Sequence, residues 1–410
     1  MENSFVFYCI IFILISEFIL ATVMDYLNAQ RFKDPIPEDL NDVYSTDEYE
    51  KSQAYKLTNY KFGVITSIFS LVLILAFLFF GGFAWVDNIA QNQSPNIIIQ
   101  ALVFFGIIMI GSDILNIPFS YYQTFVIEEK FGFNKTTKST FFLDKLKQWA
   151  MTIIVGGGIL SLVIWFFQWA GTSFWLYTWA LVALFTLFMN LFYSKLIVPL
   201  FNKQEPLQSG TLKEKIENYA AQVGFDLQNI FVINGSKRST KANAYFSGFG
   251  KEKRVTLYDT LINDLEEEEI VAVLAHEIGH YKRKHIIFNL TSSIFLTGFM
   301  LLILSLFINN PEVSLAIGVD RPSFHAALIG FGILYSPISE ITGLLMNYFS
   351  RKFEYQADDY AKNTYAALPL VTSLKKLSKN SLSNLTPHPA YVFMHYSHPP
   401  LIDRIRNLKA

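Results

Sequence analysis

Two histidines and the glutamate beside the first of them have the spacing of a metal-dependent hydrolytic centre. His276, Glu277 and His280 lie in EEEEIVAVLAHEIGHYKRK, residues 266–284, whose acidic start and basic end favour the two ends of one α-helix. Residues four apart share a helix face, so both imidazoles can reach one zinc ion, and the glutamate can take a proton from a water molecule beside it. The pattern therefore predicts a zinc site with Glu277 as general base. The alternative is a solvated helix with incidental histidines.

A catalytic zinc ion needs a third protein ligand, and the best candidate is Glu354. It lies in SRKFEYQADDYA, residues 350–361, four residues before Asp358, so both carboxylates share one face of a second helix. Glu354 can bind the ion, and Asp358 can accept a hydrogen bond from a ligand imidazole and fix its tautomer. Acidic pairs at this spacing are common on surface helices. The assignment of Glu354 as the third ligand therefore depends on the histidine motif lying on the same side of a membrane.

Composition places these residues in a membrane protein. Of 410 residues, 52% are hydrophobic and 16% are charged, whereas a soluble domain usually carries about 25% charged residues. The net charge of −1 gives no reason to expect nucleic-acid binding. The one cysteine, Cys9, excludes an internal disulfide and a cysteine-ligated zinc site. It lies in a first apolar stretch that lacks a basic start and runs to about Met24, which favours a retained helix over a signal peptide.

Stretches of roughly 20 mostly apolar residues can cross a bilayer, and the chain has seven candidates. They lie near 5–24, 63–85, 97–117, 149–170, 174–197, 286–308 and 325–346. We divide the chain into four parts: membrane helices one to five with their loops (1–200), a soluble catalytic segment with the HEIGH helix (201–285), membrane helices six and seven (286–346), and a C-terminal catalytic segment with the third zinc ligand (347–410).

Lysine and arginine alternate between the loops that join these spans. The segments after the first and third spans hold five each, those after the second and fourth hold none, and the one after the sixth holds only Arg321. Cytoplasmic loops carry an excess of lysine and arginine, so the pattern predicts an odd number of spans with the N-terminus outside. The polar block 201–285 and the tail 347–410 then share the cytoplasmic side.

Four polar or ionisable residues lie inside predicted spans: Glu17, Asp113, Asn190 and Glu340. A charge that faces lipid is costly, so these side chains should face a protein interior or a water-filled cavity. Any one of them could simply be a paired structural residue. Together they favour a hydrated interior within the membrane part.

HEIGH followed by FEYQAD resembles the type I CAAX prenyl endoproteases, zinc peptidases of the gluzincin clan, and the resemblance covers most of the chain. FVIEEKFGFN at 125–134 is similar to that family's loop after its third span. KANAYFSGF at 241–249 and RVTLYDTLI at 254–262 are similar to its pair of strands before the zinc helix. YSHPPLIDRI at 396–405 is similar to its C-terminal signature.

The resemblance implies an α-helical polytopic membrane protein in which about seven helices enclose an intramembrane chamber. A gluzincin-like zinc protease domain with a small β-sheet faces this chamber from the cytoplasmic side. His276, His280 and Glu354 would bind one Zn²⁺ per chain, and Glu277 would be the general base.

The resemblance also implies roles for three more residues. Asn243 would contact the substrate backbone from an edge strand, and His398 and Arg404 would stabilise the substrate carbonyl near the zinc ion. Taken from the sequence alone, His398 could equally be a surface histidine at a turn. His285 lies at the membrane border and off the face that carries the two ligand histidines, so we do not assign it to the metal.

We therefore expect an integral-membrane zinc metalloendopeptidase that binds a peptide or protein and is embedded in the lipid bilayer. Members of the family in eukaryotes remove the last three residues of farnesylated proteins, but the residues alone do not establish a prenylated substrate. They equally allow a bacterial inner membrane or a membrane of the endoplasmic reticulum type. Two alternatives are a quality-control metalloprotease of the heat-shock type, which has fewer spans, and a seven-span transporter, which would not explain the paired histidines.

Overall fold

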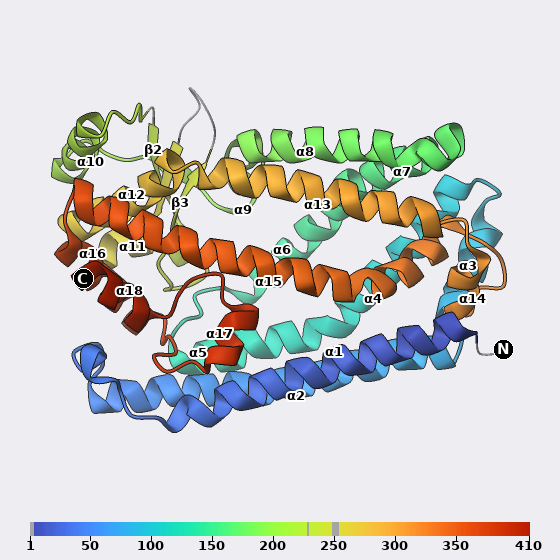
Figure 1. Ribbon diagram of the computed structural model, residues 1–410, viewed down its shortest axis with the longest axis horizontal. Helices are drawn as coiled ribbons and strands as arrows, with labels where there is room; N and C mark the ends of the chain where they lie inside the picture. Colours follow the sequence, from blue (N-terminus) through green and yellow to red (C-terminus); the bar gives the residue numbers. More distant parts are fainter. Residues whose placement is uncertain (1–3, 228, 248–253) are drawn as a thin grey trace.

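Long apolar helices run along the longest axis of the molecule, and shorter elements gather at its two ends (Figure 1). In the computed structural model, which describes residues 4–227, 229–247 and 254–410, six helical segments are long and apolar enough to cross a membrane. They are Phe5–Lys33, Thr46–Phe79, Ile97–Phe131, Lys138–Phe201, His285–Phe307 and Phe324–Thr364. Their main helices are α1 (Phe5–Gln30), α2 (Thr46–Phe79), α4 (Ile97–Tyr122), α6 (Lys138–Met151), α7 (Gly157–Ala170), α8 (Phe174–Leu196), α13 (His285–Phe307) and α15 (Phe324–Thr364).

The six segments accommodate all seven predicted spans, because Lys138–Phe201 contains two of them. The chain reverses at Gly171, which has a φ of 54°, a conformation that glycine adopts without strain. Helices α7 and α8 then pack against each other, with the rings of Trp169 and Tyr177 5.1 Å apart.

The second predicted span, 63–85, extends beyond the C-terminal end of the helix that contains it. Helix α2 begins at Thr46, where Ser45 and Glu48 form a capping box, and it ends at Phe79. Gly81 adopts a left-handed φ of 70°, and a separate helix begins at Gly82. The apolar run continues past Phe79, so hydrophobicity alone could not show that the glycines end the helix.

Shorter helices and turns connect these elements. The helices are α3 (Gly82–Gln93), α5 (Glu129–Phe131), α9 (Val198–Phe201), α10 (Thr211–Gln222), α11 (Asp259–Asp264), α12 (Glu267–Lys282), α14 (Pro311–Ala316), α16 (Ala367–Asn380), α17 (Pro389–His395) and α18 (Leu401–Lys409). Single turns of 3₁₀ or π type occupy Arg31–Lys33, Glu38–Leu40, Gln123–Glu128, Thr152–Gly156, Gly171–Ser173 and Gly235–Lys237. The sheet, α10 and α12 lie at the end of the molecule that holds the C-terminus, and α3 and α14 lie at the opposite end (Figure 1).

A small mixed sheet of four strands has the order β1-β2-β4-β3. Its strands are β1 (Gln204–Pro206), β2 (Asn229–Ile233), β3 (Ala244–Ser247) and β4 (Arg254–Tyr258). Strands β2 and β4 run parallel, while β3 pairs with β4 in the antiparallel sense. The predicted pair of strands before the zinc helix is confirmed, with β3 at the edge. The last two residues of the KANAYFSGF motif, Gly248 and Phe249, lie outside the described residues.

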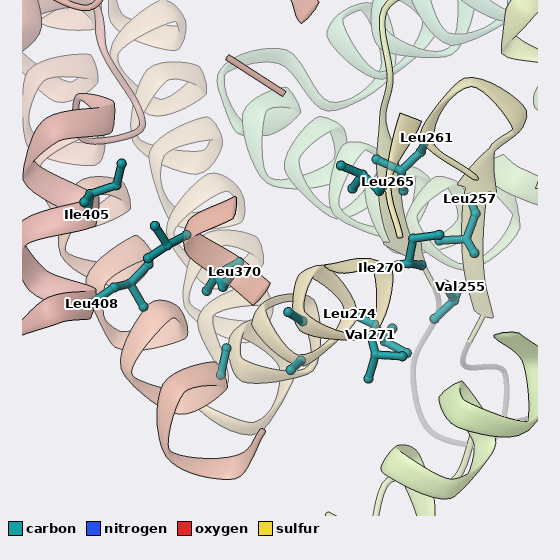
Figure 2. Close-up of a cluster of buried hydrophobic side chains, with 14 of the residues drawn as sticks. Val255, Leu257, Leu261, Leu265, Ile270, Val271, Leu274, Leu370, Ile405 and Leu408 are labelled. Atoms are coloured by element: carbon teal, nitrogen blue, oxygen red, sulfur yellow. The ribbon is translucent and has the colours of Figure 1, made fainter. Parts of the chain in front are cut away.

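The HEIGH sequence lies on α12, as predicted. Glu266 caps the helix in a capping box with Glu269, and two acidic residues between them in the first turn favour this end electrostatically. The apolar face of α12 packs into a hydrophobic cluster between the sheet and the C-terminal helices (Figure 2). Buried side chains from several elements meet there, among them Leu257, Leu274, Leu370 and Leu408. This packing fixes α12 against its neighbours along most of its length.

The seventh predicted span and the third predicted ligand lie on one continuous helix. Helix α15 has 41 residues, from Phe324 to Thr364, so the predicted division at 346/347 falls within it. Because a helix rises 1.5 Å per residue, it extends beyond the roughly 30 Å hydrocarbon core of a bilayer. This continuous helix therefore carries Glu354 directly from the membrane part to α12.

Two of the four polar residues predicted inside spans line cavities among the helices. Glu17 accepts a hydrogen bond from Ser336 and lines a cavity of about 530 Å³ between α1 and α2. Asp113 forms an ion pair with Lys145 at 2.7 Å and lines a cavity of about 740 Å³ beside α4 and α7. Asn190 and Glu340 are exposed. The cavities agree with the predicted intramembrane chamber.

Candidate metal centre

Three candidate ligand side chains from α12 and α15 converge on one point. His276 Nε2 lies 3.1 Å from His280 Nε2, His280 Nε2 lies 3.2 Å from Glu354 Oε1, and His276 Nε2 lies 3.4 Å from Glu354 Oε2. Two ligands held 2.0–2.1 Å from a tetrahedral zinc ion are separated by about 3.3–3.4 Å. The three predicted ligands therefore form the triangle that a zinc ion requires.

The chemistry of the donors also fits a metal. Glu354 is 4% exposed, and among the described residues its Oε2 accepts no hydrogen bond. A buried carboxylate is unfavourable unless cations balance it, and one such cation, the guanidinium of Arg404, has its Nη1 3.3 Å from this oxygen. Two imidazoles and one carboxylate are the ligand set of many catalytic zinc sites, and they leave a fourth position open.

The glycine of HEIGH allows the two helices to approach. A Cβ atom built on Gly279 would lie 3.1 Å from both the Cα and the carbonyl oxygen of Ala357. These are backbone atoms of α15, which cannot move aside as a side-chain end could. A side chain at this position would push α15 away from α12 and would separate Glu354 from the two histidines.

Asp358 lies beside His276, where it can play the orienting role predicted for it. It is fully buried, and its Oδ1 lies 2.8 Å from His276 Nδ1, so the other ring nitrogen faces the metal position. Burial alone would lower the pKa of His276, but hydrogen bonds to Asp358 and Glu354 raise this pKa to about 9. Since a ligand imidazole must be neutral, metal uptake at neutral pH should release this proton.

Arg404 lies behind the ligands. Its guanidinium donates hydrogen bonds of 2.9 Å and 2.6 Å to the two carboxylate oxygens of Asp358, and Nη1 is 3.3 Å from Glu354 Oε2. Arg404 is 9% exposed, and its guanidinium contacts these two carboxylates directly. The family resemblance predicts that Arg404 lies near the zinc site. Its contacts with Asp358 and Glu354 indicate that it holds these two carboxylates in place. A direct contact with the substrate stays a prediction.

Glu277 is free to act as a base. Within the part of the chain that the structure describes, its carboxylate has no hydrogen bond and no ion pair. It lines a small cavity together with Ala244, Tyr245 and Phe246 of the edge strand β3. This cavity is only about 10 Å³, so it shows that the predicted base lies close beside the predicted substrate-binding strand.

Asn243 lies one residue before β3, so the strand is shorter than the sequence pattern predicted. Pairing nevertheless reaches it, because its carbonyl accepts a hydrogen bond of 3.1 Å from Tyr258 N. Its exposed side chain accepts a hydrogen bond from the backbone N–H of Ala244 at 2.9 Å. Among the described residues its NH₂ group donates no hydrogen bond, so it can donate to a peptide carbonyl.

His398 lies beside the metal ligands and remains open to solvent. Its Nε2 is 3.3 Å from Glu354 Oε1, while 63% of the side chain is exposed. Arg351 supports the preceding helix α17 by donating hydrogen bonds to the carbonyls of Val392 and Tyr396. An exposed imidazole at the edge of the ligand triangle can reach a bound substrate.

One buried residue at the centre was not assigned by sequence reasoning. His285 is 3% exposed, and its Nδ1 lies 3.0 Å from Nδ1 of the ligand His280. The group of possible metal ligands, His276, His280 and Glu354, does not include His285. Its contact with a ligand was missed because it begins α13, after a turn whose geometry the sequence does not reveal. The only sequence feature that marked His285 was its position directly after a run of basic residues.

Comparisons with known proteins cover the whole chain. Residues 25–203 match the family model described as the CAAX prenyl protease N-terminal domain with five membrane helices, and residues 206–410 match peptidase family M48. A CAAX prenyl protease 1 homolog of Arabidopsis thaliana is 37% identical, over 96% of this chain and 95% of that protein. CAAX prenyl protease 1 of Saccharomyces cerevisiae is 33% identical, over 96% of this chain and 93% of that protein.

The fold agrees with a solved structure. The crystal structure of S. mikatae Ste24p superposes with a TM-score of 0.93 at 32% identity, and the match covers 100% of both chains. The predicted family resemblance and fold class are therefore confirmed. The match to peptidase models along the chain also argues against the transporter alternative.

Proposed function

We propose that this chain, an integral-membrane metallopeptidase of peptidase family M48, removes the C-terminal tripeptide of prenylated CAAX proteins. In this proposal it binds one zinc ion per chain. The relatives that cover nearly the whole chain are named CAAX prenyl proteases, which supports this substrate class over the heat-shock type of quality-control protease. The eukaryotic relatives support a membrane of the endoplasmic reticulum type.

The convergence of His276, His280 and Glu354 carries the proposal for the metal. Their ligand atoms lie 3.1 to 3.4 Å apart, and Glu277 follows the first of them on the same helix. Zinc in this position supplies a Lewis acid that polarises the scissile carbonyl and makes a water molecule more acidic. Glu277 takes the proton from that water molecule and can pass it to the leaving amine.

The edge strand β3 positions the substrate in this proposal. An extended peptide can add its backbone to an open sheet edge, and β3 is such an edge beside Glu277. Asn243 offers an amide at the start of this edge. His398 can donate a hydrogen bond and Arg404 provides positive charge beside Glu354, where the oxyanion of the substrate develops. Asp358 keeps His276 in the ligand tautomer.

The substrate proposal predicts that a farnesylated peptide is cleaved much faster than its unmodified counterpart. The purified full-length protein is incubated with two peptides of identical sequence that end in Cys-a-a-X, one carrying the farnesyl group. Because the prenyl group adds binding energy in the membrane part, we expect kcat/KM to be at least about tenfold higher for the farnesylated peptide. Mass spectrometry should find one product, shorter by three residues.

A peptide with the farnesyl cysteine moved to an internal position is the control for non-specific hydrophobic binding, and it should be cleaved poorly. Equal cleavage of all three peptides would rule out the prenylated C-terminus as the preferred substrate. Such a result would still leave the metallopeptidase activity intact.

We also propose that the metal centre faces the cytoplasm. The start of α1 and α12 lie at opposite ends of the long axis (Figure 1), in keeping with an odd number of spans and an outside N-terminus. This proposal predicts the labelling of single cysteines in intact membranes. In a Cys9→Ser background, cysteines at Asn92 and Thr172 should react from outside, and cysteines at Gly210 and Asn380 only after permeabilisation.

All four labelling positions are exposed in the structure, so accessibility depends on the side of the membrane. Labelling of position 210 from outside would reverse the proposed orientation and place the metal centre on the other face.

A further inference from the structure

The first residue of α13 is a buried histidine that contacts both a metal ligand and the helix of another ligand. His285 Nδ1 lies 3.0 Å from His280 Nδ1, and His285 Nε2 lies 2.8 Å from Gln356 Oε1. Its ring stacks on Phe353 with the centroids 4.1 Å apart and the planes at 9°. Gln356 and Phe353 flank Glu354 on α15. Both ring nitrogens and one ring face of His285 are therefore engaged.

A tight turn places His285 here. Helix α12 ends at Lys282 and α13 begins at His285, so only Arg283 and Lys284 connect them. Lys284 adopts a left-handed φ of 62°, which is uncommon for a residue with a side chain. This turn folds the start of α13 back against the last turn of α12, where His280 lies.

The hydrogen bonds indicate which ring nitrogen of each histidine carries its proton. The carbonyl oxygen of Gln356 can only accept, so His285 Nε2 must donate. A neutral imidazole has one donor and one acceptor, so His285 Nδ1 accepts and His280 Nδ1 must donate. The lone pair of His280 is then on Nε2, the atom that faces Glu354.

The opposite direction would block the metal site. A Gln356 amide turned over would present its NH₂ group to His285, and each imidazole would then change its tautomer. His280 Nε2 would carry a proton and could not bind a metal ion. The acceptor at position 356 therefore determines which nitrogen of His280 is available.

We propose that His285 and Gln356 are positioning residues that hold His280 in its metal-binding tautomer and orientation. The inference rests on the proposed zinc ligands and deepens that site. The two ligand histidines thus have separate supports, both anchored on α15: Asp358 contacts His276 directly, and Gln356 reaches His280 through His285. A buried histidine can pack without hydrogen bonds to both ring nitrogens. The fully buried His325, for example, has no partner for its Nδ1 among the described residues.

The test measures the affinity of the full-length protein for zinc alone, by competition with a chelator. His285→Phe keeps the ring that stacks on Phe353 but cannot accept from His280. His285→Asn places an oxygen near the position of Nδ1 and can accept. We expect Phe to raise the zinc Kd about 10- to 100-fold and Asn to raise it by no more than about threefold. His395→Phe, which changes an exposed histidine of α17, is the control and should leave the Kd unchanged.

Variants of Gln356 test the same proton direction without changing the buried ring. Gln356→Glu keeps an acceptor and should bind zinc with the affinity of the unaltered protein. Gln356→Met has similar length but no strong acceptor and should raise the Kd about tenfold. These two variants decide the question if His285→Phe does not fold. A cobalt-loaded sample gives a second readout, because a displaced His280 changes the visible absorption of the bound ion.

Wild-type zinc affinity in both His285→Phe and Gln356→Met would overturn the proposal. An equal loss in His285→Phe and His285→Asn, with equal falls in melting temperature, would also overturn it, since packing would then explain the effect. Failure of the unaltered protein to bind zinc would instead remove the proposed metal centre itself. The two failures are therefore distinguishable.

Discussion

Glu277→Gln is expected to lower kcat about 10²- to 10⁴-fold while the protein keeps its metal and its melting temperature. The amide has nearly the shape of the carboxylate but cannot take a proton from water. The Glu277 carboxylate has no hydrogen bond or ion pair within the described residues, so its replacement removes no structural contact. The measurement is kcat for a farnesylated peptide, with zinc content and melting temperature from the same preparation.

Glu268→Gln is the matched control for this change. Glu268 lies on the same helix and loses only a surface ion pair with Lys215, which should have little effect on rate. Unchanged turnover in Glu277→Gln would remove Glu277 from its role as base. Loss of zinc in that variant would show instead that the carboxylate supports the metal site.

Arg404→Ala and His398→Ala are expected to separate stability from catalysis. Removal of Arg404 leaves Asp358 and Glu354 buried without their cation, and breaking a buried charge pair of this kind costs about 3–5 kcal/mol of stability. His398 is exposed, so its removal should leave the melting temperature almost unchanged. It should lower kcat/KM about 100- to 1,000-fold if it donates to the developing oxyanion.

Both quantities are measured for each variant, with His395→Ala as the control histidine in the same tail. Normal cleavage by a stable His398→Ala protein would end its proposed role in the transition state. A wild-type melting temperature for Arg404→Ala would contradict the structural role assigned to the buried guanidinium.

The residues that converge at the candidate metal centre could be predicted because part of their geometry is local. His276 and His280 are one helical turn apart, and so are Glu354 and Asp358, so spacing alone shows which side chains share a face. The charge pattern around α12 also predicted its two ends. The sequence could not show that Gly279 brings the two helices together, because this depends on which backbone of α15 lies opposite.

The features that were missed depend on irregular backbone. The contact of His285 with His280 requires the left-handed conformation of Lys284, and lysine gives no signal for such a turn. The glycines at 81 and 82 end α2 inside an apolar run. Helix α15 continues past the change from apolar to polar residues near 346, because a helix ends where its hydrogen bonds end and not where its environment changes.

Asn243 illustrates a different limit. The alternation of residues predicted an edge strand, and β3 is the edge, but the strand begins one residue after Asn243. The side chain of Asn243 bonds to the next residue of its own chain. Its contact with a substrate is a property of a complex, so the free chain's sequence and fold can only suggest it.

The zinc content of the purified full-length protein tests the central claim most directly. Metal analysis should find about one zinc ion per chain in the unaltered protein, because His276, His280 and Glu354 form a single three-ligand site. The His276→Ala/His280→Ala double variant, prepared in parallel, should hold almost none. A double variant that keeps its full zinc content, or an active unaltered protein without any metal, would contradict the account.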